Sequence, residues 1–283
     1  MSSDIAEPHR LTLTHVFHPT DCLLSPEIAF THALKLTLAT KARLTIFHVR
    51  KDGETTEFED FPPLRDTLIR WGIRSEEGTP PDLAVPAVQV EKILDHGEEP
   101  TAAILHYLGR HPASLIVLAT HQLGGLPFFQ SVAEPVARRA GVMTLFIPPD
   151  TRGFIRVEDG TVNLRRILIP IDQHPNPQPA IQAISGLVRT IECEKMAFTL
   201  LHVGSEEEVP VVYTPRLAGW TWHTSIRTGD IVSQIIQCEK EEDVDLIVMT
   251  SGGYKGFLDA LRGSTTERML RNSRCPVLAV PAE

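Results

Sequence analysis

The chain has 283 residues, of which 42% are hydrophobic and 22% are charged, and its formal net charge is −9. These values are typical of a globular protein long enough for two domains. The acidic balance, without any basic stripe, argues against nucleic-acid binding, because a phosphate backbone would be repelled. No apolar run reaches the length of a membrane-spanning helix, so we expect no membrane contact.

The cysteines and the first residues bear on the compartment. Cys22, Cys193, Cys238 and Cys275 are scattered and form no C-x-x-C pair. This favours reduced thiols over a disulfide framework. The opening residues, MSSDIAEPHR, lack the apolar core of a signal peptide. We therefore expect a cytoplasmic protein.

An internal repeat organises the chain, since short segments of the first half recur in the same order in the second. The pairs are VFHPTD (16–21) with ILIPID (167–172), IFHV (46–49) with LLHV (200–203), DHGEEP (95–100) with RTGDIV (227–232), SLIVLAT (114–120) with DLIVMTS (245–251), SVAE (131–134) with STTE (264–267), and TLFIP (144–148) with VLAVP (277–281). The sequence predicts a tandem duplication, with domains at 1–153 and 154–283 and a linker over about 149–162.

The first half alternates strands and helices. A helix is expected after Ser25-Pro26, because these residues suit a cap and a first helical position. Its apolar residues recur at helical spacing and are expected in the core: Phe30, Ala33, Leu34 and Leu38. Further helices are predicted at about 63–71 and 101–108. Strands alternating with helices indicate an α/β fold with a parallel, doubly wound sheet.

The second half repeats this order with one omission. A helix is predicted at 231–238, with Ile231, Val232, Ile235 and Ile236 facing inward. The interval 204–227 is much shorter than its counterpart 50–95 and reads SEEEVPVVYTPRLAGW, which is typical of an extended connection. One helix is therefore expected to be missing, and the other domain or a second chain could cover that face of the sheet.

The stretch from Leu246 to Pro281 carries the candidate ligand site. A continuous apolar run predicts a buried strand, and Ser264 with Glu267 forms a capping box that predicts a helix start. Between them lie glycines that let a backbone approach a ligand: Gly252, Gly253, Gly256 and Gly263. Such a loop at a helix N-terminus can cradle phosphate. The alternative is a flexible loop capped by Ser264.

The spacing of this loop resembles that of the universal stress protein family, whose members often bind ATP. Gly253, nine residues and then Gly263-Ser264 match the family's loop, and the ending RCPVLAVP is similar to its last strand. Thr250 stands where the family has its first glycine. The resemblance covers both halves. It implies two tandem domains of the adenine nucleotide alpha hydrolase-like fold, paired antiparallel through their last strands as a pseudo-dimer.

The resemblance also implies an adenine nucleotide, ATP or AMP, in the second half, with Mg²⁺ as the only metal. Asp172 would accept hydrogen bonds from the adenine amine; the alternative is that it caps the following loop. The other implied contacts are Pro170, Ile171 and Val203 beside the base, Met249 and Thr250 along the ribose and phosphate side, and Gly253, Gly263, Ser264 and Thr265 at the phosphates.

The first half is a poorer candidate for nucleotide. Asp21 is retained, but the loop from Ala119 to Ser131 is shorter than its counterpart. Glutamines replace the spaced glycines, bulky residues fill the loop, and a proline removes a backbone donor from the next helix: Gln122 and Gln130, Pro127, Phe128 and Phe129, and Pro135. We expect a degenerate domain that is retained for pairing.

Histidines could gather at the strand ends of the first half, namely His18, His48, His96 and His121. A zinc site would need such a cluster. The alternative, which we favour, is that they occupy fold positions, because His48 and His202 belong to the repeated HV unit. No G-x-S-x-G or H-E-x-x-H motif occurs, so at most slow ATP hydrolysis is expected.

Three functional hypotheses follow. The first is a nucleotide-binding stress-response module, and the second is a ligand-free dimerisation scaffold that acts through protein partners. The third is a weak nucleotide hydrolase. The missing helix leads us to expect a homo-oligomer, at least a dimer, because an exposed apolar face usually marks an interface.

Overall fold

A computed structural model describes residues 9–22, 27–73, 88–120, 122–123, 126–127, 132–148, 151, 153–251 and 273–282. By their contacts, the described residues fall into two compact units. The N-terminal unit contains 13–142 and 155–162, and the C-terminal unit contains 1–12, 143–154 and 163–283. Strand β7, Thr144–Ile147, ends the first sequence repeat and yet belongs to the C-terminal unit.

The N-terminal unit is built on parallel strands in the order β4-β1-β2-β3. Their bounds are β1 His15–Pro19, β2 Arg43–Arg50, β3 Val90–His96 and β4 Leu115–Ala119. Every residue of β1 and β4 is buried, as expected for strands covered on both faces. A two-stranded hairpin, β5 Gln122–Leu123 and β6 Leu126–Pro127, follows β4.

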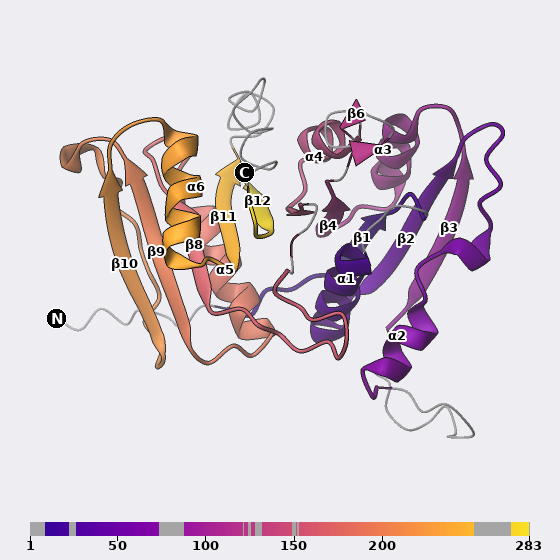
Figure 1. The fold of residues 1–283 in the computed structure, drawn as a ribbon, viewed down its shortest axis with the longest axis horizontal. Coiled ribbons are helices and arrows are strands. Elements are labelled where there is room, and N and C mark those ends of the chain that lie inside the picture. The colour runs from indigo at the N-terminus through magenta and orange to yellow at the C-terminus, as the bar shows by residue number, and fades with distance from the viewer. Residues whose placement is uncertain are drawn as a thin grey trace. The chain divides into compact units, whose positions relative to one another are not determined.

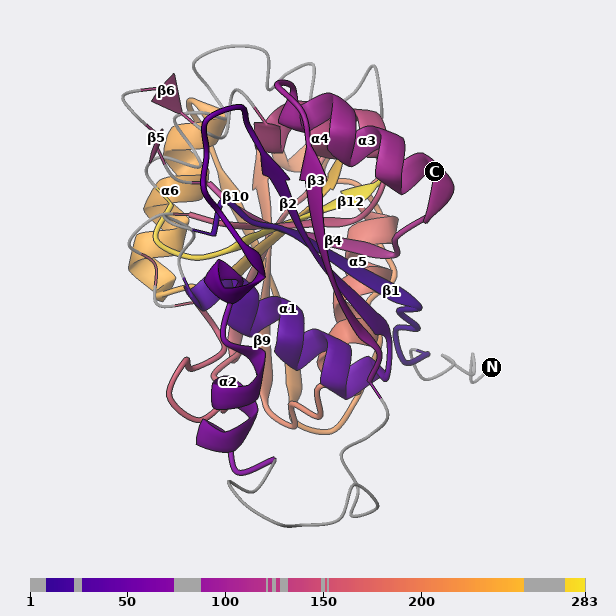
Figure 2. The same cartoon turned by 90° about the vertical axis from the view of Figure 1, so that its right-hand side faces the viewer.

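The helices of this unit cover both faces of its sheet (Figure 2). They are α1 Glu27–Thr40, α2 Leu64–Arg70, α3 Pro100–Arg110 and α4 Glu134–Ala140. Phe30 of α1 lies 6.3 Å from His18, whereas Tyr107 of α3 stacks 5.6 Å from the neighbouring Phe17, on the other face. The predicted α1 core is confirmed for Phe30, Ala33 and Leu34, and Leu38 is half-buried.

The C-terminal unit has the strand order β10-β9-β8-β11-β12-β7; Figure 1 labels β10, β9, β8, β11 and β12. Its elements are β8 Arg166–Pro170, α5 Gln178–Thr190, β9 Met196–Val203, β10 Trp220–Arg227, α6 Ile231–Glu242, β11 Leu246–Ser251 and β12 Val277–Pro281. The strands run parallel except β7, which pairs antiparallel with β12 and sets Leu145 opposite Leu278. The predicted pairing of the two last strands, and the α/β class, are confirmed.

The first two strands of both repeats have the same register. Pro19 lies opposite Phe47, and the equivalent Pro170 lies opposite Leu201. On the C-terminal sheet, α5 contacts β11 and β12, whereas α6 contacts β8 and β9. No helix among the described residues is long and apolar enough to cross a membrane.

The predicted absence of a helix between β9 and β10 is confirmed. A 3₁₀ turn, Glu206–Glu208, is followed by an extended connection. Trp222 of β10 stacks on Phe198 with ring centroids 4.0 Å apart and 8° between the planes, and its Nε1 donates to the Pro215 carbonyl at 3.0 Å. The connection and the indole ring of Trp222 therefore cover this part of the sheet from within the same unit. The sequence had left open that another domain or a second chain covers it.

The prediction that Ile231 of α6 faces the core is wrong. Ile231 is 55% exposed, whereas Val232, Ile235 and Ile236 are buried as predicted. The helix starts at Ile231, directly after its cap Asp230, whose side chain accepts from Ser233 N at 3.0 Å. The buried stripe continues to Glu239, so its helical spacing starts at position 232 and leaves 231 outside it.

Candidate functional site

The candidate site lies at the carboxyl ends of three adjacent strands, β9, β8 and β11. Their parallel register brings the segments around Asp172, Val203 and Thr250 to one edge of the C-terminal sheet. Ligands of open α/β sheets bind at this edge. The remaining predicted residues, Gly253, Gly263, Ser264 and Thr265, lie outside the described residues, as does the predicted helix start.

The described site residues differ in accessibility. Asp172 is exposed, Pro170 and Val203 are half-buried, and Ile171, Met249 and Thr250 are buried. Asp172 Oδ1 accepts from the backbone N–H of Gln173 at 2.7 Å, which is the contact expected of a loop cap. Its exposure also leaves the carboxylate accessible to a donor on a ligand, so both interpretations of Asp172 are compatible with its position.

Thr250 has a role that the sequence did not reveal. Its Oγ1 accepts from the backbone N–H of Ala180 at 3.3 Å, in the first turn of α5. Gln178 N is bound by Asn176 Oδ1 at 2.9 Å, Pro179 has no N–H, and the N-cap, Pro177, offers no side-chain bond. Thr250 therefore accepts a hydrogen bond from a first-turn N–H of α5, although Ala180 lies 70 residues before it in the chain.

Two histidines at equivalent positions of the repeats make the same contact. His48 Nδ1 lies 2.8 Å from the Thr20 carbonyl, and His202 Nδ1 lies 3.3 Å from the Ile171 carbonyl. Each carbonyl belongs to the residue before the retained aspartate, so each histidine holds the end of the first strand of its repeat. These contacts support the interpretation of both histidines as fold positions.

A carboxylate accompanies each of these histidines. His48 Nε2 is 3.5 Å from Glu54 Oε1. In the second repeat, a Cβ on Gly204 would lie 2.7 Å from His202 Nε2 and 3.3 Å from Glu208 Oε2, so glycine is needed where these two groups approach the backbone. Gln173 Nε2 donates to the Glu208 carbonyl at 3.4 Å, which ties the loop carrying Asp172 to the acidic turn.

The part of the candidate site around Asp172 is therefore acidic and rich in acceptors. Glu206, Glu207 and Glu208 form the turn beside the Asp172 loop. Hydrogen bonds from Ser205 lower the pKa of Glu208. Such a rim suits an amine donor on a ligand and repels phosphate.

The other predicted histidines do not gather into a described cluster. His18 is fully buried, with Nδ1 2.9 Å from the Val117 carbonyl, and burial lowers its pKa to about 4. His96 is exposed at the end of β3, with Nε2 3.4 Å from Arg50. His121 lies outside the described residues. Within the described ranges, no group of three or more His, Cys, Asp or Glu could hold a metal ion.

At the corresponding edge of the N-terminal unit, the retained aspartate is less exposed than Asp172. Asp21 is half-buried, and Cys22 beside it has a pKa raised to about 12 by burial and by the nearby negative charge of Asp21. In the loop predicted to be degenerate, the structure describes Ala119, Thr120 and the backbone of β5 and β6. Phe128, Phe129 and Gln130 lie outside the described residues. All four cysteines of the chain are free thiols.

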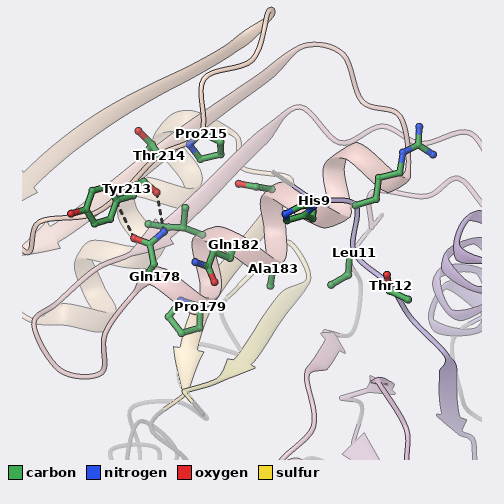
Figure 3. Close-up of a pocket in the computed structure, with 14 residues that line it drawn as sticks. His9, Leu11, Thr12, Gln178, Pro179, Gln182, Ala183, Tyr213, Thr214 and Pro215 are labelled. Atoms are coloured by element: carbon green, nitrogen blue, oxygen red, sulfur yellow. Dashed lines mark hydrogen bonds between the residues drawn. The ribbon is translucent and has the colours of Figure 1, made fainter. Parts of the chain in front are cut away.

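A cavity of about 620 Å³ lies elsewhere in the C-terminal unit (Figure 3). It is bounded by α5, residues 9–12 and residues 213–215, and none of the predicted site residues line it. Gln178 holds one wall through paired bonds of 2.9 Å to the backbone of Tyr213. Leu11 N donates to the Gly186 carbonyl at 3.1 Å on the other side, where a Cβ on Gly186 would meet the His9 carbonyl at 2.9 Å.

The fold and the site define a class of protein, an α/β module with mostly parallel strands and a candidate ligand site at their carboxyl ends. The chain belongs to the universal stress protein family, whose model matches residues 13–148 and 216–281, more than half of the chain. The resemblance found in the sequence is thereby confirmed.

A curated relative, a universal stress protein from Methanocaldococcus jannaschii, is 38% identical over 58 residues, 20% of this chain and 34% of that protein. The match thus spans about a third of that relative's length. A universal stress protein structure from Archaeoglobus fulgidus DSM 4304 has 18% identity and a TM-score of 0.58, covering 95% of this chain and 98% of its own. A protein of unknown function from Pseudomonas aeruginosa PAO1 has 14% identity and a TM-score of 0.61, with 95% and 92% covered. These structures support the fold.

Proposed function

We propose that the chain binds one adenine nucleotide, ATP or AMP, at the carboxyl edge of the C-terminal sheet. The observation that carries this is the exposed Asp172 carboxylate beside an acidic turn, at the ends of adjacent parallel strands. A carboxylate there can accept the hydrogens of the adenine amine. The predicted loop from Gly253 to Thr265 would hold the phosphates, with Mg²⁺ accompanying a triphosphate.

The proposal assigns unequal roles to the two sequence repeats. The second, 154–283, is the binding domain, and the first, 1–153, is the pairing domain. Calorimetric titration with ATP is expected to give one site per chain, and two equivalent sites would contradict this. Gly263→Val should abolish binding, because its Cβ would occupy the phosphate approach. Unchanged affinity would place the site elsewhere.

A matched pair of variants tests the role of Asp172. Asp172→Ala should weaken ATP binding about tenfold or more, because the amine loses a charged acceptor. Asp21→Ala makes the same change at the equivalent position of the first repeat and should leave ATP affinity unchanged. Equal effects of the two variants would refute the assignment of the site to the second repeat.

The second candidate is a ligand-free cytoplasmic scaffold that self-associates and acts through protein partners. The antiparallel β7–β12 pairing favours it, because β7, the last strand of the first repeat, joins that repeat to the last strand of the second. Mass spectrometry of the gently purified protein separates the two candidates. Co-purified ATP or AMP supports the first, whereas nucleotide-free protein without ATP affinity supports the second. Measurable ATP turnover would instead indicate a weak hydrolase.

A further inference from the structure

Strand β10 ends the strand order of the C-terminal sheet, and one of its edges is unpaired among the described residues. Within the described part of the chain it pairs only with β9, along its whole length from Trp220 to Arg227. On an edge strand, alternate backbone N–H and C=O groups point away from the sheet and can pair with another strand. Along β10 the exposed side chains are Thr221, His223, Thr224 and Ile226.

This edge lacks the charges that usually protect edge strands from pairing. Strand β3 ends the order of the N-terminal sheet and carries charged residues along its length, in the sequence VEKILDH. Strand β10 reads WTWHTSIR, with neither lysine, acid nor proline. Its single formal charge, Arg227, is at its end and is bound to Glu241 at 2.7 Å. Of the two edges, β10 is the one suited to pairing.

We propose that β10 pairs antiparallel with β10 of a second copy of this chain across a two-fold axis. Such a contact is isologous, so both copies use the same surface and the assembly closes as a dimer. An axis between antiparallel strands of one sheet must be perpendicular to that sheet. Residues that face each other across antiparallel strands point to the same side of the sheet. Under two-fold symmetry, this requires one residue of β10 to face its own copy across the axis.

Thr224 satisfies this condition and makes the pairing self-complementary. With Thr224 opposite itself, Trp222 faces Ile226 of the second copy on one side of the sheet, and His223 faces Ser225 on the other. Aromatic to β-branched pairs and threonine pairs are among the stabilising cross-strand combinations. Ile226, which is 42% exposed, would be covered. Arg227 would face Thr221, so no like charges meet.

The β10 contact would be the surface through which the chain self-associates. This proposal does not depend on nucleotide binding. Light scattering and sedimentation of the full-length chain should show a dimer. Thr224→Lys places two like charges at the axis and should raise the dimer dissociation constant about tenfold or more. Glu91→Lys introduces the same residue on β3 and should leave the constant unchanged. Circular dichroism verifies that both variants are folded.

Cysteine cross-linking tests the register. Thr224→Cys should be joined to its own copy by a thiol cross-linker with a short spacer, because opposite Cβ atoms in antiparallel strands are about 4.5–5.5 Å apart, whereas a direct disulfide needs roughly 3.5–4.5 Å. Thr221→Cys should not, because it faces position 227 of the second copy. A dimer that persists in Thr224→Lys and fails to cross-link through position 224 overturns the β10 surface and leaves self-association standing. A monomeric full-length chain overturns both.

Discussion

Thr250→Val removes the hydroxyl that satisfies the first turn of α5 and keeps the branched shape of the side chain. The donor that loses its partner is the Ala180 N–H, which is buried. A buried donor left unsatisfied costs about 1–3 kcal/mol, and loss of a capping side chain costs about 1 kcal/mol. We therefore expect the free energy of unfolding to fall by about 1–2 kcal/mol. Thr250→Ser keeps the hydroxyl but removes a buried methyl group, so it is expected to lose about 0.5–1 kcal/mol.

Urea denaturation of the full-length chain, followed by far-ultraviolet circular dichroism, measures the difference between these variants. Hydrogen exchange of the α5 amides provides a local measurement, because the first turn should exchange faster in Thr250→Val than in Thr250→Ser. If valine and serine have the same stability and the same α5 protection, the hydroxyl does not cap the helix, and the argument from the Ala180 contact fails.

Two further predictions concern stability. Trp222→Phe keeps the ring on Phe198 but loses the bond to Pro215, so it should cost about 1 kcal/mol, whereas Trp222→Ala should cost about 2–3 kcal/mol; equal thermal midpoints for the two variants would contradict the stacking. Burial lowers the pKa of both His18 and His32 to about 4, so the unfolded chain binds more protons than the folded chain between about pH 6.5 and 4. The free energy of unfolding should therefore decrease as the pH is lowered from about 6.5 to 4, by about 3 kcal/mol per histidine. In urea denaturation measured at a series of pH values, His32→Gln should remove roughly half of this pH dependence.

Much of the fold could be predicted because its signals are local. Continuous apolar runs mark β4 and β11, and helical spacing marks α1 and α6. The repeat predicts that both halves use the same elements in the same order, and the family resemblance implies the pairing of β7 with β12. The short interval after β9 is enough to predict the missing helix. For the candidate site, the family resemblance predicted Asp172 and Val203, and the structure places both segments at the carboxyl ends of adjacent strands.

The contacts that decide how these elements meet are absent from any local pattern. Thr250 caps α5 across 70 residues, because the parallel register of β8 and β11 places the end of β11 beside the end of β8, and α5 follows β8. Trp222 reaches the Pro215 carbonyl only because the connection folds back over β10. Spacing predicts which residues are buried. The partner of each buried or polar group depends on register and on the path of the chain, and only the tertiary structure determines these.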